Sequence, residues 1–215
     1  MKKGILYLHG KGGSAQEAAH YTPICCGYDV IGLDYRGTTP WETKKEILAA
    51  FETLHRQYGG VSVIANSIGA YFAMNALSET AVERAFFISP IVNMEKLICD
   101  MMTWAGVTER ELADRQEIPT AFGETLSWKY LCYVREHPIA WHTPTDILYA
   151  GGDNLTSYET VSAFAKETNA TLQIMPEGEH WFHTEEQLAF LDRWLTERIS
   201  CIADMFQTVD RTNAK

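Results

Sequence analysis

The sequence predicts an α/β protein in which a mostly parallel β-sheet carries helices on both faces. Short apolar runs rich in β-branched residues alternate along the chain with longer stretches that have helical periodicity and capping signals. Strands that are apolar throughout are typical of parallel sheets, because both faces of such a sheet are covered. Ligands bind at the carboxyl ends of these strands, so polar residues at those positions are candidates for a site.

The expected strands are six short apolar runs: Ile5–Leu8, Tyr28–Leu33, Val61–Ala65, Ala85–Ser89, Ile147–Ala150 and Thr171–Met175. The expected helices begin at capping boxes, in which a Ser or Thr and a Glu or Gln three residues later bond the first free amides: Ser14–Glu17, Thr43–Glu46, Thr156–Glu159 and Thr184–Gln187. The helix after Thr43 is expected to end at Gly59-Gly60.

Composition restricts the classes of partner. The formal net charge of −10 and the pI near 5.1 argue against nucleic acid, which requires a basic face, and against an anionic membrane surface. The 5 cysteines have no C-x-x-C spacing, so we expect free thiols in a reducing compartment, the cytoplasm. The apolar run after Lys3 is too short for a secretory signal, and no run is long enough to span a membrane.

The turn Ala65-Asn66-Ser67-Ile68-Gly69 joins the third expected strand to a helix with an apolar stripe. A serine on a strained strand-to-helix turn projects its hydroxyl into solvent, and its neighbours must be small so that the backbones can approach. Ser67 is therefore a candidate nucleophile. The alternative is that Ser67 is an ordinary helix N-cap.

Two more polar residues follow expected strands. Asp153 comes after the run that ends at Ala150, and His180 comes after the last strand. His183, three residues further on, makes a His-x-x-His pair, but a helical zinc motif has i,i+4 spacing, so we expect a structural role for it. Asp146 and Asp192 compete for the acid position. Asp146 lies at the wrong end of its strand and Asp192 lies inside a helix, so we expect both to be solvated.

The turn and the chain order Ser67, Asp153, His180 resemble those of the α/β-hydrolases, a superfamily of esterases, lipases and peptidase-like enzymes. Their turn is G-x-S-x-G, and Ala65 takes the place of the first glycine here. The resemblance implies the α/β-hydrolase fold. It also implies that Ser67 is the nucleophile, that His180 is its base, and that Asp153 orients His180.

The same resemblance implies an oxyanion hole of two backbone amides. One is the amide of Ile68, directly after the nucleophile. The other belongs to the loop after the first strand, where the pattern His-Gly-x indicates the amide of Lys11, with that of Gly12 as the alternative. We expect no metal and no organic cofactor. The Gly-rich stretch Gly10–Gly13 lacks the full P-loop spacing, so a nucleotide site is rejected.

The segment from about 91 to 141 is longer than a crossover between strands needs. It contains many Met and aromatic residues. Leu97, Met101 and Trp104 fall on one helical face, the Thr108–Glu111 capping box predicts a second short helix, and Leu126–Arg135 indicates a third. In this superfamily an insertion here is often a cap over the site. We therefore expect residues 1–215 to form one domain with a helical cap insertion at about 91–141. Trp104 and Trp128 are its candidate substrate-binding residues; core packing is the alternative.

These features predict a serine hydrolase that cleaves an ester or related acyl bond of a small to medium apolar substrate through an acyl-enzyme. The expected partner is a small-molecule ester or acyl substrate, with neither nucleic acid nor membrane. Two alternatives stay open. A small serine peptidase or amidase uses the same three groups, and a non-catalytic binding protein has the same fold without the chemistry.

Overall fold

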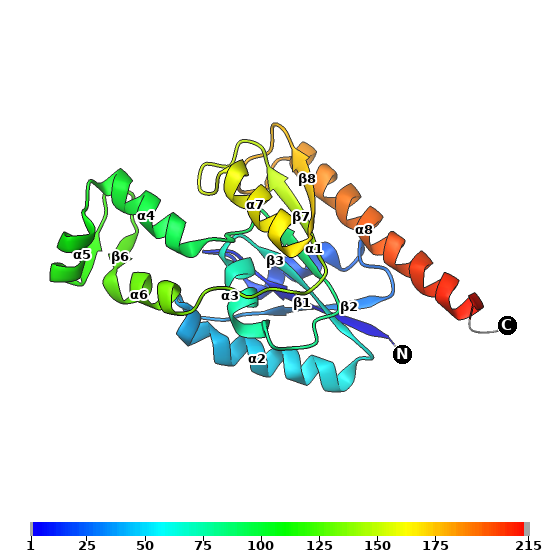
Figure 1. Ribbon diagram of the computed structural model, residues 1–215. Coiled ribbons are helices and arrows are strands. Elements are labelled where there is room, and N and C mark those ends of the chain that lie inside the picture. The colour runs from blue at the N-terminus through cyan, green and yellow to red at the C-terminus, as the bar shows by residue number, and fades with distance from the viewer. Residues whose placement is uncertain (1, 213–215) are drawn as a thin grey trace.

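Six strands form the main sheet of the computed structural model, which describes residues 2–212 and the side chains of residues 2–200. They are β1 (Lys3–Leu8), β2 (Tyr28–Leu33), β3 (Val61–Asn66), β4 (Ala85–Ile88), β7 (Thr145–Ala150) and β8 (Thr171–Met175). Every neighbouring pair is parallel, and the order across the sheet is β2-β1-β3-β4-β7-β8 (Figure 1). The carboxyl ends of all six strands therefore lie along one edge of the sheet.

Helices cover both faces of this sheet. One face carries α2 (Pro40–Gln57), α3 (Ile68–Leu77) and α7 (Tyr158–Thr168); the other carries α1 (Ala18–Tyr21), which follows a 3-10 turn, and α8 (Glu185–Thr212). Alternate side chains of β1 divide between the two cores, because successive residues of a strand point to opposite faces. Leu6 and Leu8 join the first core, and Ile5 and Tyr7 join the second.

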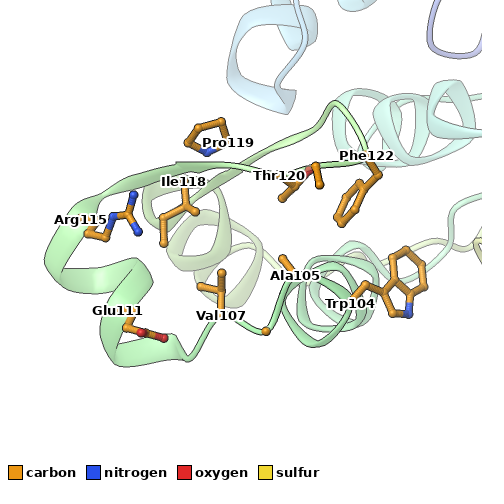
Figure 2. A pocket seen from close by; sticks show the side chains of 11 residues that line it. Trp104, Ala105, Val107, Glu111, Arg115, Ile118, Pro119, Thr120 and Phe122 are labelled. Atoms are coloured by element: carbon orange, nitrogen blue, oxygen red, sulfur yellow. The ribbon is translucent and has the colours of Figure 1, made fainter.

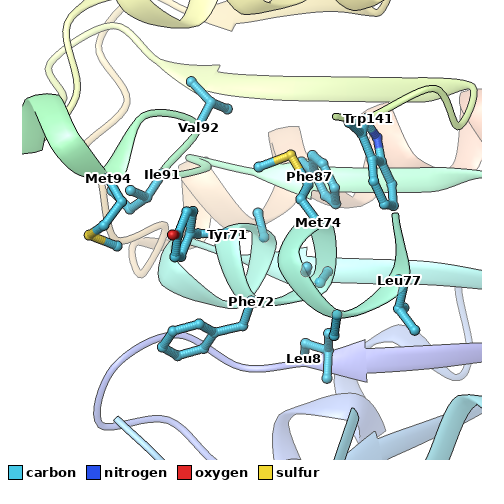
Figure 3. Packing of buried hydrophobic residues seen from close by; sticks show 14 of the residues in the cluster. Leu8, Tyr71, Phe72, Met74, Leu77, Phe87, Ile91, Val92, Met94 and Trp141 are labelled. Atoms are coloured by element: carbon cyan, nitrogen blue, oxygen red, sulfur yellow. The ribbon is translucent and has the colours of Figure 1, made fainter. Parts of the chain in front are cut away.

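Helix α3 is almost wholly buried: nine of its ten residues are inaccessible to solvent. Figure 3 shows Tyr71, Met74 and Leu77 of this helix packed among side chains that include Phe87 and Trp141. Each large apolar side chain buried in this way contributes about 1.5–3 kcal/mol. The first turn of α3, which follows Ser67, is therefore held by a large part of the core.

Two of the helices that cover the sheet begin at other residues than predicted. Helix α2 begins at Pro40, with Thr39 and Glu42 as its capping box, so the predicted start at Thr43–Glu46 is wrong. Thr43 is instead fully buried, and its hydroxyl donates to the Thr39 carbonyl at 3.1 Å. Helix α7 begins one residue later than predicted, with Ser157 as its N-cap. The stop before Gly59-Gly60 is confirmed, since α2 ends at Gln57.

The segment after β4 forms a separate group of short elements, which we call the cap: α4 (Met94–Ala105), α5 (Glu109–Arg115), β5 (Glu117–Pro119), β6 (Thr125–Ser127) and α6 (Trp128–Glu136). Figure 1 shows the cap projecting beyond one end of the sheet. Strands β5 and β6 pair as an antiparallel hairpin that the sequence did not predict. Because Leu126 lies in β6, the third helix begins later than the predicted Leu126–Arg135.

Ion pairs and apolar contacts hold the cap together. The Arg135 guanidinium on α6 donates to Glu95 on α4 and to Glu109 on α5, each at 2.7 Å. Leu112 and Leu131 are fully buried and belong to the same core as α2 and α3. The cap thus shares its core with the sheet. Within residues 2–212, no helix combines the length and apolarity that a membrane span needs.

Candidate active site

The turn at Ser67 has the strained conformation that the sequence predicts. Ser67 has φ 53° and ψ −121°, outside the regions that side-chain-bearing residues ordinarily occupy. Its amide donates to the Ile88 carbonyl at 2.9 Å, and its carbonyl accepts from the Ile91 amide at 3.1 Å. These bonds tie the turn to the end of β4, which holds the strained geometry in place.

The need for small residues at this turn is visible at Gly69. A Cβ at this position would lie 2.6 Å from the His9 carbonyl oxygen and 2.7 Å from that of Leu8. Both atoms are backbone and cannot swing away. The first turn of α3 therefore packs directly against the end of β1, and any larger residue would push the two apart.

The loops after β7 and β8 carry Asp153 and His180, and backbone bonds hold these loops side by side. The Gly151 amide donates to the Met175 carbonyl, and the Gly152 amide donates to the Gly178 carbonyl, both at 2.8 Å. Parallel pairing of β7 with β8 extends in this way past the ends of the strands. The side chains of Asp153 and His180 therefore lie close together.

The three predicted side chains meet. His180 Nε2 lies 2.8 Å from Ser67 Oγ, and His180 Nδ1 lies 2.6 Å from Asp153 Oδ2. The Asp153 side chain is fully buried, and that of His180 is 15% exposed. A buried carboxylate accepts a hydrogen bond from Nδ1–H and so holds the proton on Nδ1, which leaves the Nε2 lone pair of the neutral ring for the serine hydroxyl.

Neighbouring groups fix the orientation of the Asp153 carboxylate. Its Oδ1 accepts from the amides of Leu155 at 2.8 Å and Thr156 at 3.1 Å. The Tyr149 hydroxyl donates to the Thr156 carbonyl at 2.9 Å and so fixes the same loop. Burial, and then the charge of Asp153, raise the pKa of Tyr149, so this hydroxyl stays a neutral donor. The other carboxylate oxygen of Asp153, Oδ2, accepts the hydrogen bond from His180.

The loop after β1 packs against Ser67. A Cβ on Gly10 would lie 3.3 Å from the Cβ of Ser67, so Lys11 follows directly after a residue in contact with the candidate nucleophile. Among the described residues, the amides of Lys11 and Ile68 donate to no protein acceptor. The same holds for the Gly12 amide in the part of the chain that the structure describes. These unpaired donors belong to the residue directly after Ser67 and to the loop that packs against Ser67.

His183 lies outside this group. Its Nδ1 donates to the Trp181 carbonyl at 2.6 Å, and its side chain is 41% exposed. Among residues 2–200, no three His, Cys, Asp or Glu side chains gather in a way that could hold a metal ion. The ring of His183 is committed to its own loop.

The prediction that Asp146 is solvated is wrong. Its side chain is fully buried at the start of β7, the edge of the sheet opposite Asp153. It accepts from Arg84 Nε at 2.6 Å and from the Thr171 hydroxyl at 2.5 Å. Asp192, by contrast, is 39% exposed and bonds the ring of His20. The buried Asp146 carboxylate therefore stabilises the fold by binding Arg84 and Thr171.

The cap contains a cavity of about 390 Å³ that is partly open to solvent (Figure 2). Trp104 lines it, whereas Trp128 is half-buried and packs against the main core. Phe122, which the sequence did not single out, faces Trp104 with the ring centroids 6.1 Å apart. The Lys11 ammonium bonds Glu124, so the β5–β6 turn reaches the loop beside Ser67. A Gly after Phe122 was the sole local sign of this turn.

No family model and no curated protein sequence matches the chain. Solved structures are similar to it. Est1E from Butyrivibrio proteoclasticus is 18% identical with a TM-score of 0.71, over 92% of this chain and 86% of its own. Alpha/beta hydrolase domain-containing protein 10 from mouse is 15% identical with a TM-score of 0.73, over 96% and 90%. The Pyrococcus furiosus esterase Pf2001 is 22% identical with a TM-score of 0.59, over 93% and 81%. At these identities the likeness shows the fold alone.

Proposed function

We propose that this chain, which has the fold of the α/β-hydrolases, is a serine hydrolase that cleaves an ester or related acyl bond of a small to medium apolar substrate. One observation carries the proposal: two successive hydrogen bonds, of 2.8 and 2.6 Å, connect Ser67 Oγ through His180 to Asp153. The esterases among the similar structures support the same activity.

Acylation begins when Ser67 Oγ attacks the substrate carbonyl carbon and His180 Nε2 takes its proton. A serine hydroxyl is a weak nucleophile unless a base within hydrogen-bonding distance accepts that proton. Asp153 keeps the proton of Nδ1 in place and stabilises the imidazolium that forms. The tetrahedral intermediate then expels the leaving group, which takes the proton from His180.

The oxyanion of the intermediate lies between the amides of Lys11 and Ile68. Fixed backbone donors cost no reorganisation as the charge develops, and one such donor contributes about 3–4 kcal/mol to transition-state stabilisation. Water then enters, loses a proton to His180 and attacks the acyl-enzyme, and Ser67 regains its proton as the acid product leaves.

Trp104 contributes an apolar wall to the substrate site through the cap cavity that it lines. The two aromatic side chains that line this cavity, Trp104 and Phe122, favour an apolar group in the substrate. A solved structure of Est1E holds ferulic acid, so a hydroxycinnamate ester belongs in the substrate panel.

The test is covalent labelling by a fluorophosphonate, followed by mass spectrometry of the intact protein and of its peptides. We expect one adduct, on Ser67, and none in Ser67→Ala. Ser78→Ala, at the other end of α3, is the matched control and should label fully. A labelled Ser67→Ala protein would refute the assignment. Absence of labelling in the folded wild type would favour the non-catalytic alternative, and faster turnover of aminoacyl amides than of esters would favour the amidase.

A further inference from the structure

The cap cavity is lined by a mixture of apolar and polar groups and has one charged end. Its volume of about 390 Å³ lies within the range of small-molecule sites. Figure 2 shows Trp104 and Phe122 at one end of the cavity and Arg115 and Glu111 at the other. Between them the lining residues include the apolar Ile118 and the polar Thr120. A ligand that matches this cavity is apolar beside the two rings and polar at its far end.

The two aromatic rings at one end of the cavity, those of Trp104 and Phe122, are more exposed to solvent than rings packed in a core. Trp104 is 52% exposed and Phe122 is 45% exposed, and their rings meet edge to face. Large apolar side chains that gather in solvent mark binding surfaces. These rings form an apolar entrance to the cavity.

The charged end holds one cation and one anion, Arg115 and Glu111, on the same helix, and after the hydrogen bonds from Thr108 the charge of Arg115 helps to lower the pKa of Glu111. Glu111 is partly committed, because one of its carboxylate oxygens accepts from the Thr108 amide at 2.8 Å and from the Thr108 hydroxyl at 2.7 Å. Arg115 has no ion pair or hydrogen bond from its guanidinium among the described residues. A guanidinium with free donors binds a carboxylate through two parallel hydrogen bonds.

The entrance is connected to the loop beside the candidate nucleophile. Glu124 lies two residues after Phe122 and bonds the side chain of Lys11, and the neighbouring Gly10 packs against Ser67. Two residues of chain span at most about 7 Å. The Phe122 end of the cavity therefore lies within about 7 Å of backbone from Glu124, the residue that bonds the loop beside Ser67.

We propose that the cap cavity binds the far end of a substrate whose medium-length apolar arm terminates in a carboxylate, and that Arg115 binds this terminus. The inference rests on the proposed hydrolase function and names its substrate class. Either the acyl group or the alcohol group of the ester carries the arm. In both cases Arg115 determines specificity through the substrate's far end and takes no part in bond cleavage.

The test compares kcat/KM for para-nitrophenyl octanoate with that for the para-nitrophenyl monoester of octanedioic acid. A parallel pair, the acetate esters of octanol and of ω-hydroxyoctanoic acid, shows on which side of the ester the arm lies. In one of the two pairs we expect the carboxylated ester to be preferred. Arg115→Gln should reduce this preference about tenfold, the usual effect of losing a hydrogen bond to a charged group. The preference should also weaken as salt is added.

Arg110→Gln is the matched control, because Arg110 lies on the same helix but does not line the cavity. It should leave the preference as in the wild type. Phe122→Ala should lower kcat/KM for both long esters relative to the acetyl ester, whereas Tyr158→Ala, which removes an exposed aromatic on α7, should not. Thermal melts establish that each variant is folded.

The outcomes separate this inference from the function on which it rests. If the wild type neither labels with fluorophosphonate nor cleaves any ester, the hydrolase proposal fails. If it cleaves these esters but Arg115→Gln and Arg110→Gln show the same preference as the wild type in both pairs, the assignment of the cavity is overturned. A reduced preference in Arg115→Gln alone supports it.

Discussion

Asp146 and Asp153 flank the same strand and lead to opposite predictions, one for stability and one for catalysis. Asp146 is fully buried at the start of β7 and neutralises Arg84, with the Thr171 hydroxyl on its other oxygen. Asp153 follows the end of β7 and bonds a histidine. Replacing each carboxylate by the isosteric amide removes a charge and little volume. The pair therefore separates the two roles within one structural element.

For Asp146→Asn the effect follows from the charged partners that remain, Arg84 at 2.6 Å and Arg198 at 3.8 Å. Removing one member of a buried ion pair costs about 3–5 kcal/mol, because the other charge is left uncompensated. Arg84 is 28% exposed and so is partly hydrated, which favours the lower figure, about 3 kcal/mol. At about 2–4 °C per kcal/mol for a domain of this size, we expect the melting temperature to fall by about 6–12 °C.

For Asp153→Asn we expect the opposite: a small loss of stability and a large loss of activity. Its partner is a neutral ring in the resting state, so no charge is stranded, and the loss is about 1 kcal/mol or about 2–4 °C. The amide nitrogen, however, opposes the Nδ1 proton of His180 and favours the wrong tautomer. By analogy with serine proteases, kcat should fall about 10⁴-fold.

Calorimetric melts and steady-state hydrolysis of a short aryl ester measure the two effects on the same preparations. Asp146→Asn should retain wild-type kcat at a temperature where it is folded. The reasoning fails if Asp146→Asn lowers kcat as much as Asp153→Asn does. It also fails if the melting temperature of Asp146→Asn lies within about 2 °C of the wild type.

Three further predictions follow from the site and its surroundings. His180→Ala should reduce turnover on the order of a thousandfold or more, and His183→Ala much less; the reverse ranking would show that the base is misassigned. Gly69→Ala should destabilise the fold and distort the turn at Ser67, because its Cβ would lie 2.6 Å from the backbone oxygen of His9, directly after β1. An unchanged melting temperature would contradict the packing described. Burial raises the pKa of the Cys25 thiol to about 12, so iodoacetamide at pH 8 should modify the exposed Cys26 and spare Cys25, which peptide mapping would reveal.

The strands were predictable because each is a local signal, an apolar run with polar or glycine boundaries. Tyr28–Leu33 and Thr171–Met175 agree with the structure at both ends. The start of α2 was misread because two consecutive capping boxes begin four residues apart, at Thr39 and at Thr43. Pro40 decides between them, since proline suits the first turn of a helix, where its missing amide costs nothing.

The misjudged acid and the missed hairpin both depend on distant partners. Asp146 is held by Arg84 and Thr171, which lie 62 and 25 residues away in sequence. Strands β5 and β6 have three residues each, too few for a periodic signal, and each exists because the other pairs with it. Contacts of this kind leave no pattern within a short window of sequence.

The candidate triad was predictable only in part, because it depends on local signals and on distant contacts. Each member was found from a local signal, the end of a strand or a strained turn. Their meeting, however, requires the loop after β8 to cross the ends of β7 and β4, because three strand spacings, about 14 Å, separate β8 from β3. The bonds from Gly151 and Gly152 to the β8 side fix the start of that crossing, and His180 completes it at Ser67. Residue types and chain order thus indicate the chemistry, whereas the fold of one loop determines whether the groups can perform it.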